Sequence, residues 1–479
     1  MSLLSPSATA QPINQCKIQA SSFKPVSLGF PVNPERLSKI TNPKILVIPY
    51  RLKDENRFDF GSKEKEILSI ASDNIYGISN GLSKVTFIYN SIIDLDMTLK
   101  ERNSIKAPSN YINEWQERYD KSTWGFMKKF IIDQDKNIDF SGIDAVILFS
   151  SSTVVSAENA EAMMMTKDIY GPWFNPISTS EGLINNVIVI YNNFDIFTMT
   201  HEIMHLYGLT DLYGSLNRPD RSLMATDDTG ILAFEKWILG WLPDSKVQCI
   251  SDLNEIDQAS ASNQFTLKNG EGDQLIVIPT GSRTSLVVDS VKREDKQWLT
   301  FYSLDNEAGP PINTFISDDF DFSIEISSKR GIGTQIDSPD YILLISNNDD
   351  KNLSLNLIPK KLINSDAAKK LVSEANANAV IELKAKNEAK DKAALELKAK
   401  QEAEAKAATE LKTMQDADAK DRAEKAATEL KAKQDADAKA AADKVAAASK
   451  KTTITCVKGK LVKKVTAIKP VCPKGYKKK

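Results

Sequence analysis

The sequence has few of the features that mark membrane, nucleic-acid-binding or redox proteins. No run approaches the roughly eighteen consecutive apolar residues of a transmembrane helix, so no membrane span is expected. The formal net charge of the 479 residues is only -2, which gives no overall attraction to nucleic acid. The sequence also lacks a glycine-rich phosphate loop and a Cys-x-x-Cys pair, which argues against phosphate-loop and dithiol chemistry.

The N-terminus lacks the basic and apolar parts of a signal peptide, although Ala8-Thr9-Ala10 has the small-x-small form of a cleavage site. One hypothesis is that the start codon is placed too late and only the end of an export signal is kept. It predicts a bacterial protein that is secreted or associated with the cell envelope. The alternative is a disordered polar leader, and upstream codons without a basic and apolar run would favour it.

The cysteine content is low. Four cysteines, Cys16, Cys249, Cys456 and Cys472, permit three pairings. Cys456 and Cys472 stand in one short basic segment and are the expected disulfide. In the chain-entropy model a bridge of that loop length stabilises its segment by about 3 kcal/mol. Free buried thiols are the alternative, above all for Cys249.

The local composition and the pattern of apolar residues predict five segments. Residues 1–40 form a leader or strap. Short β-branched strands alternate with helix-length segments over residues 41–246, which indicates a layered sheet with helices on its faces. Short alternating segments over residues 247–362 are typical of an all-β unit, such as a sandwich. A helical stalk (363–450) and a basic tail (451–479) follow. The first layered segment has expected strands at 44–50, 85–89, 144–149 and 186–191, and expected helices at 63–78, 110–133, 196–206 and 230–240.

The stalk has no proline or glycine between residues 366 and 449 and consists almost wholly of strong helix formers. Leu383, Leu397 and Leu411 recur every fourteen residues. One Leu in two heptads makes a poor coiled-coil seam, so we expect a solvated single helix or a weak Ala coiled coil. At about 1.5 Å per residue it would reach on the order of 120 Å and act as a spacer.

The tail carries eleven lysines and no acidic residue between Lys450 and Lys479. The pair Cys456 and Cys472 predicts a small stapled hairpin. Such a charge favours adhesion to an anionic polymer or lipid of the cell envelope, while a merely solubilising end is the alternative. The Asp/Asn runs at 318–321 and 347–350 could bind calcium, but plain turns are the favoured interpretation.

The two histidines, His201 and His205, are four residues apart, with Glu202 directly after the first. Chance would give this arrangement roughly once in a few thousand sequences. Side chains four apart lie on one helix face, so both imidazoles can reach a single ion at zinc–nitrogen distances of about 2.0 to 2.1 Å. Glu202, offset by one position, would accept a proton from zinc-bound water and later deliver it to the leaving amine.

Gly208 and Asp211 extend the motif to His-Glu-Ile-Met-His-Leu-Tyr-Gly-Leu-Thr-Asp. Gly208 lets the chain leave the helix sharply, because glycine adopts a left-handed conformation at little cost. Asp211 can then approach the metal as a third ligand and leave a fourth position for water. The sequence therefore predicts one catalytic zinc ion held by His201, His205 and Asp211.

These residues also have structural interpretations. The histidines could be core side chains bonded to carbonyl groups, and Asp211 could cap a following turn while water completes the coordination. Met224, after the helix, could form an apolar floor beneath the zinc site or be ordinary core packing. Because both histidines belong to the motif, none is left for a Ser-His-Asp or Cys-His site.

The run 201–213 resembles the extended motif of the immune inhibitor A-like (M6-type) metallopeptidases, a bacterial group in the metzincin clan. Residues 232–242 are similar to that family's segment after the Met-turn, which supports Met224 as the turn methionine. The resemblance covers roughly residues 40–305. It implies an α+β fold with a metzincin-like mixed sheet and an active-site helix, then a β-rich domain, and secretion as a protease.

The leading hypothesis is therefore a secreted zinc endopeptidase that acts on protein or peptide substrates. One alternative is a cell-surface adhesin or scaffold that presents a degenerate peptidase domain on the helical stalk. A second keeps the metal site but assigns it to amide cleavage in wall peptides. Stoichiometric chelatable zinc would separate the enzyme from the adhesin, and a substrate panel with and without chelator would separate the two hydrolases.

Overall fold

The protein is described from a computed structural model. The described residues are 13–21, 26–54, 60–105, 121–150, 160–165, 175–190, 194–212, 222–225, 230–251, 263–293, 296–306, 312–314, 324–325, 332, 334–348 and 351–479. The expected leader up to residue 12, the acidic run 318–321 and the start of the expected helix at 110 lie outside them. Within these ranges no helix combines the length and the apolar character needed to cross a bilayer.

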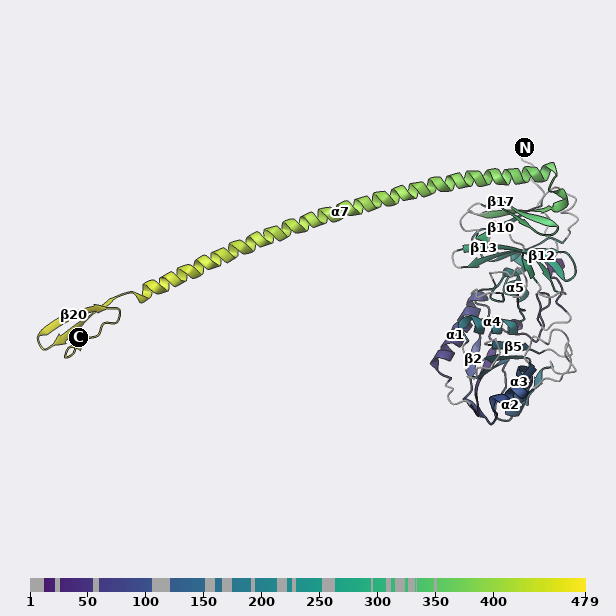
Figure 1. Ribbon diagram of the computed structural model, residues 1–479, viewed down its shortest axis with the longest axis horizontal. Helices are drawn as coiled ribbons and strands as arrows, with labels where there is room; N and C mark the ends of the chain where they lie inside the picture. Colours follow the sequence, from purple (N-terminus) through teal and green to yellow (C-terminus); the bar gives the residue numbers. More distant parts are fainter. Residues whose placement is uncertain are drawn as a thin grey trace. The chain divides into compact units, whose positions relative to one another are not determined.

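The chain divides into two compact units, residues 1–383 and 384–479. The first unit contains a six-stranded mixed sheet of order β2-β1-β4-β8-β5, with β3 on β1. Figure 1 labels β2 and β5 of this sheet. The strands are β1 (Lys44–Leu52), β2 (Thr86–Tyr89), β3 (Ile93–Leu95), β4 (Ala145–Ser150), β5 (Ala160–Met164) and β8 (Asn186–Ile190). Neighbours are parallel except β5, which runs antiparallel to β8. β4 and β8 are buried along their whole length, which explains their unbroken apolar sequences.

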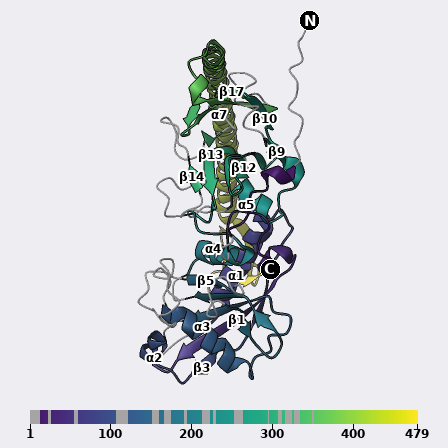
Figure 2. The same cartoon turned by 90° about the vertical axis from the view of Figure 1, so that its right-hand side faces the viewer.

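Helices cover both faces of this sheet (Figure 2). They are α1 (Ser62–Ile78), α2 (Leu99–Ser104), α3 (Lys121–Gln134) and α4 (Ile196–Tyr207), and a small hairpin, β6 (Ile177–Ser178) and β7 (Leu183–Ile184), lies between β5 and β8 in sequence. Strand side chains alternate between faces. Ile45 and Val47 of β1 therefore share one core with α1 and α4, while Leu46 and Ile48 share another with α3.

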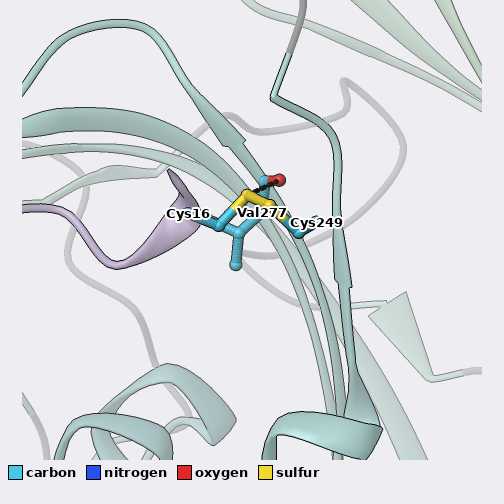
Figure 3. The surroundings of a disulfide bond; sticks show 3 residues. All are labelled: Cys16, Cys249 and Val277. Carbon is cyan, nitrogen blue, oxygen red and sulfur yellow. Dashed lines mark hydrogen bonds between the residues drawn. A yellow bond between two sulfur atoms is a disulfide. The ribbon is translucent and has the colours of Figure 1, made fainter. Parts of the chain in front are cut away.

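An N-terminal strap precedes β1 and is anchored in the core. Its short helices are η1 (Ile13–Cys16) and η2 (Leu37–Lys39). Cys16 is bonded to Cys249, 233 residues away, and its Sγ lies 3.1 Å from the carbonyl oxygen of Val277 (Figure 3). This disulfide joins the strap to the β-rich region that follows the layered sheet.

The β-rich region consists of two sheets packed face to face. One has the order β14-β13-β12-β11-β9, with β15 on β13, and the other β10-β18-β17-β16. Two short helices, α5 (Ala233–Ile238) and η5 (Asp244–Lys246), precede these sheets. The strands are β9 (Val247–Cys249), β10 (Asn263–Lys268), β11 (Gln274–Pro279), β12 (Thr284–Arg293), β13 (Lys296–Asp305), β14 (Ile312–Thr314), β15 (Ile324–Glu325), β16 (Gln335–Asp337), β17 (Tyr341–Asn348) and β18 (Asn352–Pro359). Val288 and Phe301 of the first sheet share one core with Leu343 and Leu355 of the second, the arrangement of a β-sandwich.

The long helix α7 (Asp366–Ala448) follows η6 (Lys360–Leu362). Its first turns are not part of a free stalk, because Ala368 and Ala375 are buried against Leu344 and Ile358 of the second sheet. Beyond residue 383 the helix belongs to the second unit. There its aliphatic side chains are exposed, with Leu397, Leu411 and Leu430 at 58–59%.

The second unit ends in a three-stranded sheet of order β20-β19-β21. Its strands are β19 (Thr452–Lys458), β20 (Leu461–Ala467) and β21 (Lys477–Lys478). A disulfide of 2.05 Å joins Cys456 of β19 to Cys472. This small sheet has one fully buried side chain, that of Cys456.

The whole chain is a mixed α/β protein with several sheets and a long C-terminal helix, consistent with the expected α+β class. β1, β2, β4 and β8 coincide within a few residues with the strands that the sequence pattern predicts. β3 and β5 were not expected. They are short, and β5 consists of Ala, Glu and Met, which have little strand preference of their own.

Candidate metal centre

Helix α4 carries both histidines and begins at a side-chain cap. The carboxylate of Asp195 accepts a hydrogen bond of 2.7 Å from the amide of Thr198, which satisfies a donor at the helix start. From Met199 to Tyr207 every residue is buried except His201, which is half-buried. Beyond its first turn the helix is therefore enclosed, and within this stretch His201 is its accessible point.

The helix ends at Gly208, which adopts φ 117° and ψ 9°. The amides of Gly208 and Leu209 donate to the carbonyls of His205 and Met204, the two bonds of a Schellman motif. A β-carbon at Gly208 would lie 2.7 Å from Cγ1 of Val32 in the strap. Glycine is required both by the left-handed backbone and by the strap that packs over it.

Backbone carbonyls orient both imidazole rings. Nδ1 of His201 lies 2.8 Å from the carbonyl oxygen of Leu223, and Nδ1 of His205 lies 2.8 Å from that of Leu209. A carbonyl oxygen only accepts hydrogen bonds, so each Nδ1 carries a proton and donates. In the neutral ring Nε2 then keeps its lone pair and can bind a cation.

The turn after the helix brings Asp211 to the same point. Its Oδ1 lies 3.2 Å from Nε2 of His201 and 3.1 Å from Nε2 of His205. One ligand atom from each of the three residues lies within 4.8 Å of the others. The structure thus brings together the three residues that the motif predicts as metal ligands.

The distances from Asp211 to the two histidines and the donor types fit a tetrahedral metal ion. Ligand atoms about 2.05 Å from zinc are about 3.3 Å apart, close to the 3.1 and 3.2 Å between Oδ1 of Asp211 and the two Nε2 atoms. Two nitrogen lone pairs that face one carboxylate oxygen repel it unless a cation lies between them. Two imidazoles and one carboxylate are a donor set that zinc accepts.

Without a metal, a proton on His205 can offset the same repulsion, and the pKa values of His205 and Asp211 are shifted accordingly. Burial lowers the pKa of His205, but the charge of Asp211, the hydrogen bond to it and the charge of Glu202 outweigh burial and raise this pKa to about 9. Burial raises the pKa of Asp211, but the two histidines hold it well below its ordinary range. A metal would therefore enter the site in exchange for a proton.

Glu202 lies beside the ligands. It follows His201 directly, so its side chain leaves the helix roughly 100° around the axis from that of His201. The side chain is 9% exposed, and its charge contributes to the raised pKa of His205. A carboxylate in this position can exchange protons with a water molecule at the metal.

A turn around Met224 supports the site from the side. The amide of Leu212, next to Asp211, donates to the carbonyl of Met224 over 2.8 Å. The neighbouring carbonyl of Leu223 is the one that holds the ring of His201. Met224 itself is fully buried in the core that contains α4. The backbone of this turn therefore contacts the ring of His201 and the residue that follows Asp211.

Glu235 of α5 was not among the predicted site residues, yet it holds this turn. Its Oε2 accepts hydrogen bonds of 2.7 Å from the hydroxyl of Ser222 and 2.7 Å from the amide of Leu232. The hydroxyl of Ser222 in turn accepts from the amide of Met224 at 3.1 Å. Glu235 is fully buried. The available signal was a pair of charged residues, Glu235 and Lys236, inside a short run that is otherwise apolar, because a buried charge needs a partner.

Tyr213, the last residue of the motif, and the loop 226–229 lie outside the described residues. Cys456 and Cys472 lie in the second unit, apart from this site in sequence. Asn347 and Asn348 of the second Asp/Asn run form the end of β17.

Similarity to known proteins is distant. No family model and no curated protein matches the chain. A crystal structure of metalloproteinase-II from Bacteroides fragilis is similar over 48% of this chain, with 14% sequence identity and a TM-score of 0.24. The match spans 60% of that metalloproteinase. The chain thus has a weak structural similarity to a metalloproteinase.

Proposed function

We propose that the chain is a zinc-dependent endopeptidase that hydrolyses peptide bonds in protein substrates, with its metal bound by His201, His205 and Asp211. The main support is the placement of Oδ1 of Asp211 3.1–3.2 Å from two Nε2 atoms, in rings whose Nδ1 atoms are held by carbonyls. The resemblance of residues 201–213 to immune inhibitor A-like metallopeptidases agrees with it. The catalytic part would comprise residues 41–246.

In this proposal each residue of the site has a separate role in peptide hydrolysis. A bound zinc ion would supply Lewis acidity to the scissile carbonyl and to water. Glu202 takes a proton from the attacking water and returns it to the leaving amine. The carbonyls of Leu209 and Leu223 keep both rings in the tautomer that a metal requires. The side chain of Asp211 is 31% exposed and that of His205 only 7%, so substrate would approach from the side of Asp211.

The disulfides of the chain support the proposal that the protein is exported. All four cysteines are in disulfides, Cys16 with Cys249 and Cys456 with Cys472. Disulfides form and persist in oxidising surroundings such as the cell exterior. A secreted or envelope-associated location follows as part of the proposal.

The deciding experiment uses the full chain and Glu202→Gln. The variant should keep about one zinc ion per chain by atomic absorption and lose cleavage of unfolded casein by at least about a hundredfold, because the general base is lost. Glu66→Gln changes an exposed glutamate of α1 and should leave both readouts unchanged.

Two outcomes would refute the proposal. One is casein cleavage by Glu202→Gln at the rate of the unmodified protein. The other is a folded protein that takes up no stoichiometric zinc, as expected for an adhesin. A protein that binds zinc but cleaves wall peptides and not casein would move the assignment to the second hydrolase.

A further inference from the structure

The C-terminal sheet carries an unbalanced positive charge. Residues 452–479 contain nine lysines and no Asp or Glu, and all nine side chains are exposed. A small unit with this charge attracts an anionic surface, and salt weakens the attraction. Charge alone does not distinguish a soluble polyanion from an anionic membrane.

The tip of the β19–β20 hairpin supplies the distinguishing feature. Lys458 pairs with Leu461 across a two-residue turn of Gly459 and Lys460, and Gly459 has φ 56°. Leu461 and the following Val462 are each 64% exposed. Two large aliphatic side chains therefore project into solvent directly beside a tight turn.

These two side chains point to opposite faces of the hairpin. Leu461 lies on the face of Lys458, whereas Val462 is paired with Val457 on the other face. Lys463 and Lys464 follow directly and alternate in the same way. The tip thus carries one exposed aliphatic side chain on each face, with Lys458 and Lys460 at the turn and Lys463 and Lys464 directly behind it.

The base of the tip is held in place. Cys456, which forms the disulfide with Cys472, is paired with Lys463 on one side and Lys478 on the other. A β-carbon at Gly475 would lie 3.3 Å from Nζ of Lys458, so the lysine side chain lies over this glycine. Strand pairing and the disulfide therefore hold the base of the tip within the sheet.

We propose that this tip docks on an anionic phospholipid surface. Leu461 and Val462 enter the boundary between headgroups and acyl chains, and the surrounding lysines Lys458, Lys460, Lys463 and Lys464 lie at the level of the lipid phosphates. The inference concerns a part of the chain separate from the proposed active site and does not depend on it.

Other anionic partners explain less of the tip. A soluble polyanion would pair with the lysines but would leave Leu461 and Val462 in water. Proteins that bind single-stranded nucleic acid combine a positively charged groove with aromatic side chains on which the bases stack, whereas residues 452–479 contain one aromatic residue, Tyr476. A lipid surface accounts for both the charge and the exposed aliphatic pair.

The test measures sedimentation of the full chain with large vesicles. The vesicles are either pure phosphatidylcholine or contain about one quarter phosphatidylglycerol, and binding to long-chain polyphosphate is measured in parallel. Leu461→Ser/Val462→Ser keeps the charge and removes the aliphatic pair, while Lys463→Glu/Lys464→Glu does the reverse. Lys398→Glu/Lys400→Glu, at exposed positions of α7, is the matched charge control.

The proposal predicts binding to anionic vesicles but not to neutral ones. Each tip variant should bind anionic vesicles at least about tenfold more weakly, and the control should bind like the unmodified chain. Leu461→Ser/Val462→Ser should retain polyphosphate binding. Mass spectrometry of the Cys456–Cys472 bridge verifies that the sheet has formed in each variant.

Two results would overturn it. If Leu461→Ser/Val462→Ser binds anionic vesicles as tightly as the unmodified chain while Lys463→Glu/Lys464→Glu loses both vesicles and polyphosphate, the partner is a polyanion recognised by charge. If the unmodified chain does not sediment with anionic vesicles at low salt, the tip has no membrane role.

Discussion

The Nδ1 of His201 donates a hydrogen bond of 2.8 Å to the carbonyl oxygen of Leu223, 22 residues farther along the chain. The orientation of one proposed metal ligand therefore depends on a turn outside its own helix. That turn is held by the hydroxyl of Ser222, which donates to the buried carboxylate of Glu235. A substitution of Glu235 should therefore weaken metal binding through the backbone of this turn, although Glu235 is not itself a proposed ligand.

The first prediction concerns Glu235→Ala. The hydroxyl of Ser222 and the amide of Leu232 would lose their common acceptor, so the free energy of unfolding should fall by about 2–5 kcal/mol. Zinc affinity should fall by about tenfold or more, because the orientation of the His201 ring is loosened. Urea unfolding of the chelated protein and competition with a fluorescent zinc chelator measure the two effects.

Glu235→Gln is the matched control for that prediction. Its amide oxygen can accept both hydrogen bonds, so zinc affinity should stay close to that of the unmodified protein. Equal zinc affinities for the Ala and Gln variants would show that Glu235 stabilises the fold without positioning His201.

The second prediction compares two glycines. Gly208→Ala places a β-carbon 2.7 Å from Cγ1 of Val32 at a φ of 117°, so the free energy of unfolding should fall by about 2–4 kcal/mol. Gly77→Ala in α1 meets nothing within 4 Å and should raise it by about 0.5–1 kcal/mol, as expected inside a helix. Calorimetric melting of both variants checks the opposite signs, and a stable Gly208→Ala protein would contradict the packing of the strap on α4.

These contacts separate what sequence reasoning can supply from what it cannot. The spacing of His201 and His205 implies a shared helix face, and Gly208 implies a sharp helix end, because both follow from local backbone geometry. The carbonyls of Leu209 and Leu223 carry no such signal. Every residue has a carbonyl, and which one meets a ring depends on the fold of the whole unit.

Long-range pairing is the second limit. The sequence favoured Cys456 with Cys472 because they are close in the chain, but it left Cys249 open. Its partner, Cys16, is 233 residues away, and loop-closure entropy rises too slowly with length to exclude or select such a pair. Only the packing of the strap against the β-rich region brings the two sulfurs together.

The third prediction follows from that bridge. Replacing both Cys16 and Cys249 by serine should lower the free energy of unfolding of the first unit by about 2–5 kcal/mol, because the bridge closes a very long loop. The same double replacement at Cys456 and Cys472 should leave the melting of the first unit unchanged, since that bridge lies in the second unit. Scanning calorimetry under non-reducing conditions distinguishes the pairs, and identical melting curves for the two double variants would contradict the role of the strap.

A buried carboxylate at the start of α5 makes the stability of the first unit depend on pH. Asp289 of β12 is fully buried and accepts hydrogen bonds from the amides of Ala233 and Phe234 and from the hydroxyl of Tyr302, over 3.0 to 3.1 Å. Burial raises its pKa from 3.8 to about 6, more than the three hydrogen bonds lower it. Folding therefore favours the neutral acid over the carboxylate, relative to the unfolded chain.

The fourth prediction gives the sign of this effect. The pKa of Asp289 is higher in the folded than in the unfolded chain, so its protonation stabilises the fold below about pH 4, and this contribution is lost as the pH rises through about 6. A shift of this size corresponds to about 3 kcal/mol. Asp289→Asn cannot titrate, so the unfolding free energy of the unmodified protein minus that of the variant should fall by most of this amount between pH 4 and pH 7 in urea titrations. A difference that rises with pH would contradict this sign. It would mean that the three hydrogen-bond donors stabilise the ionised carboxylate of Asp289 more than burial disfavours it.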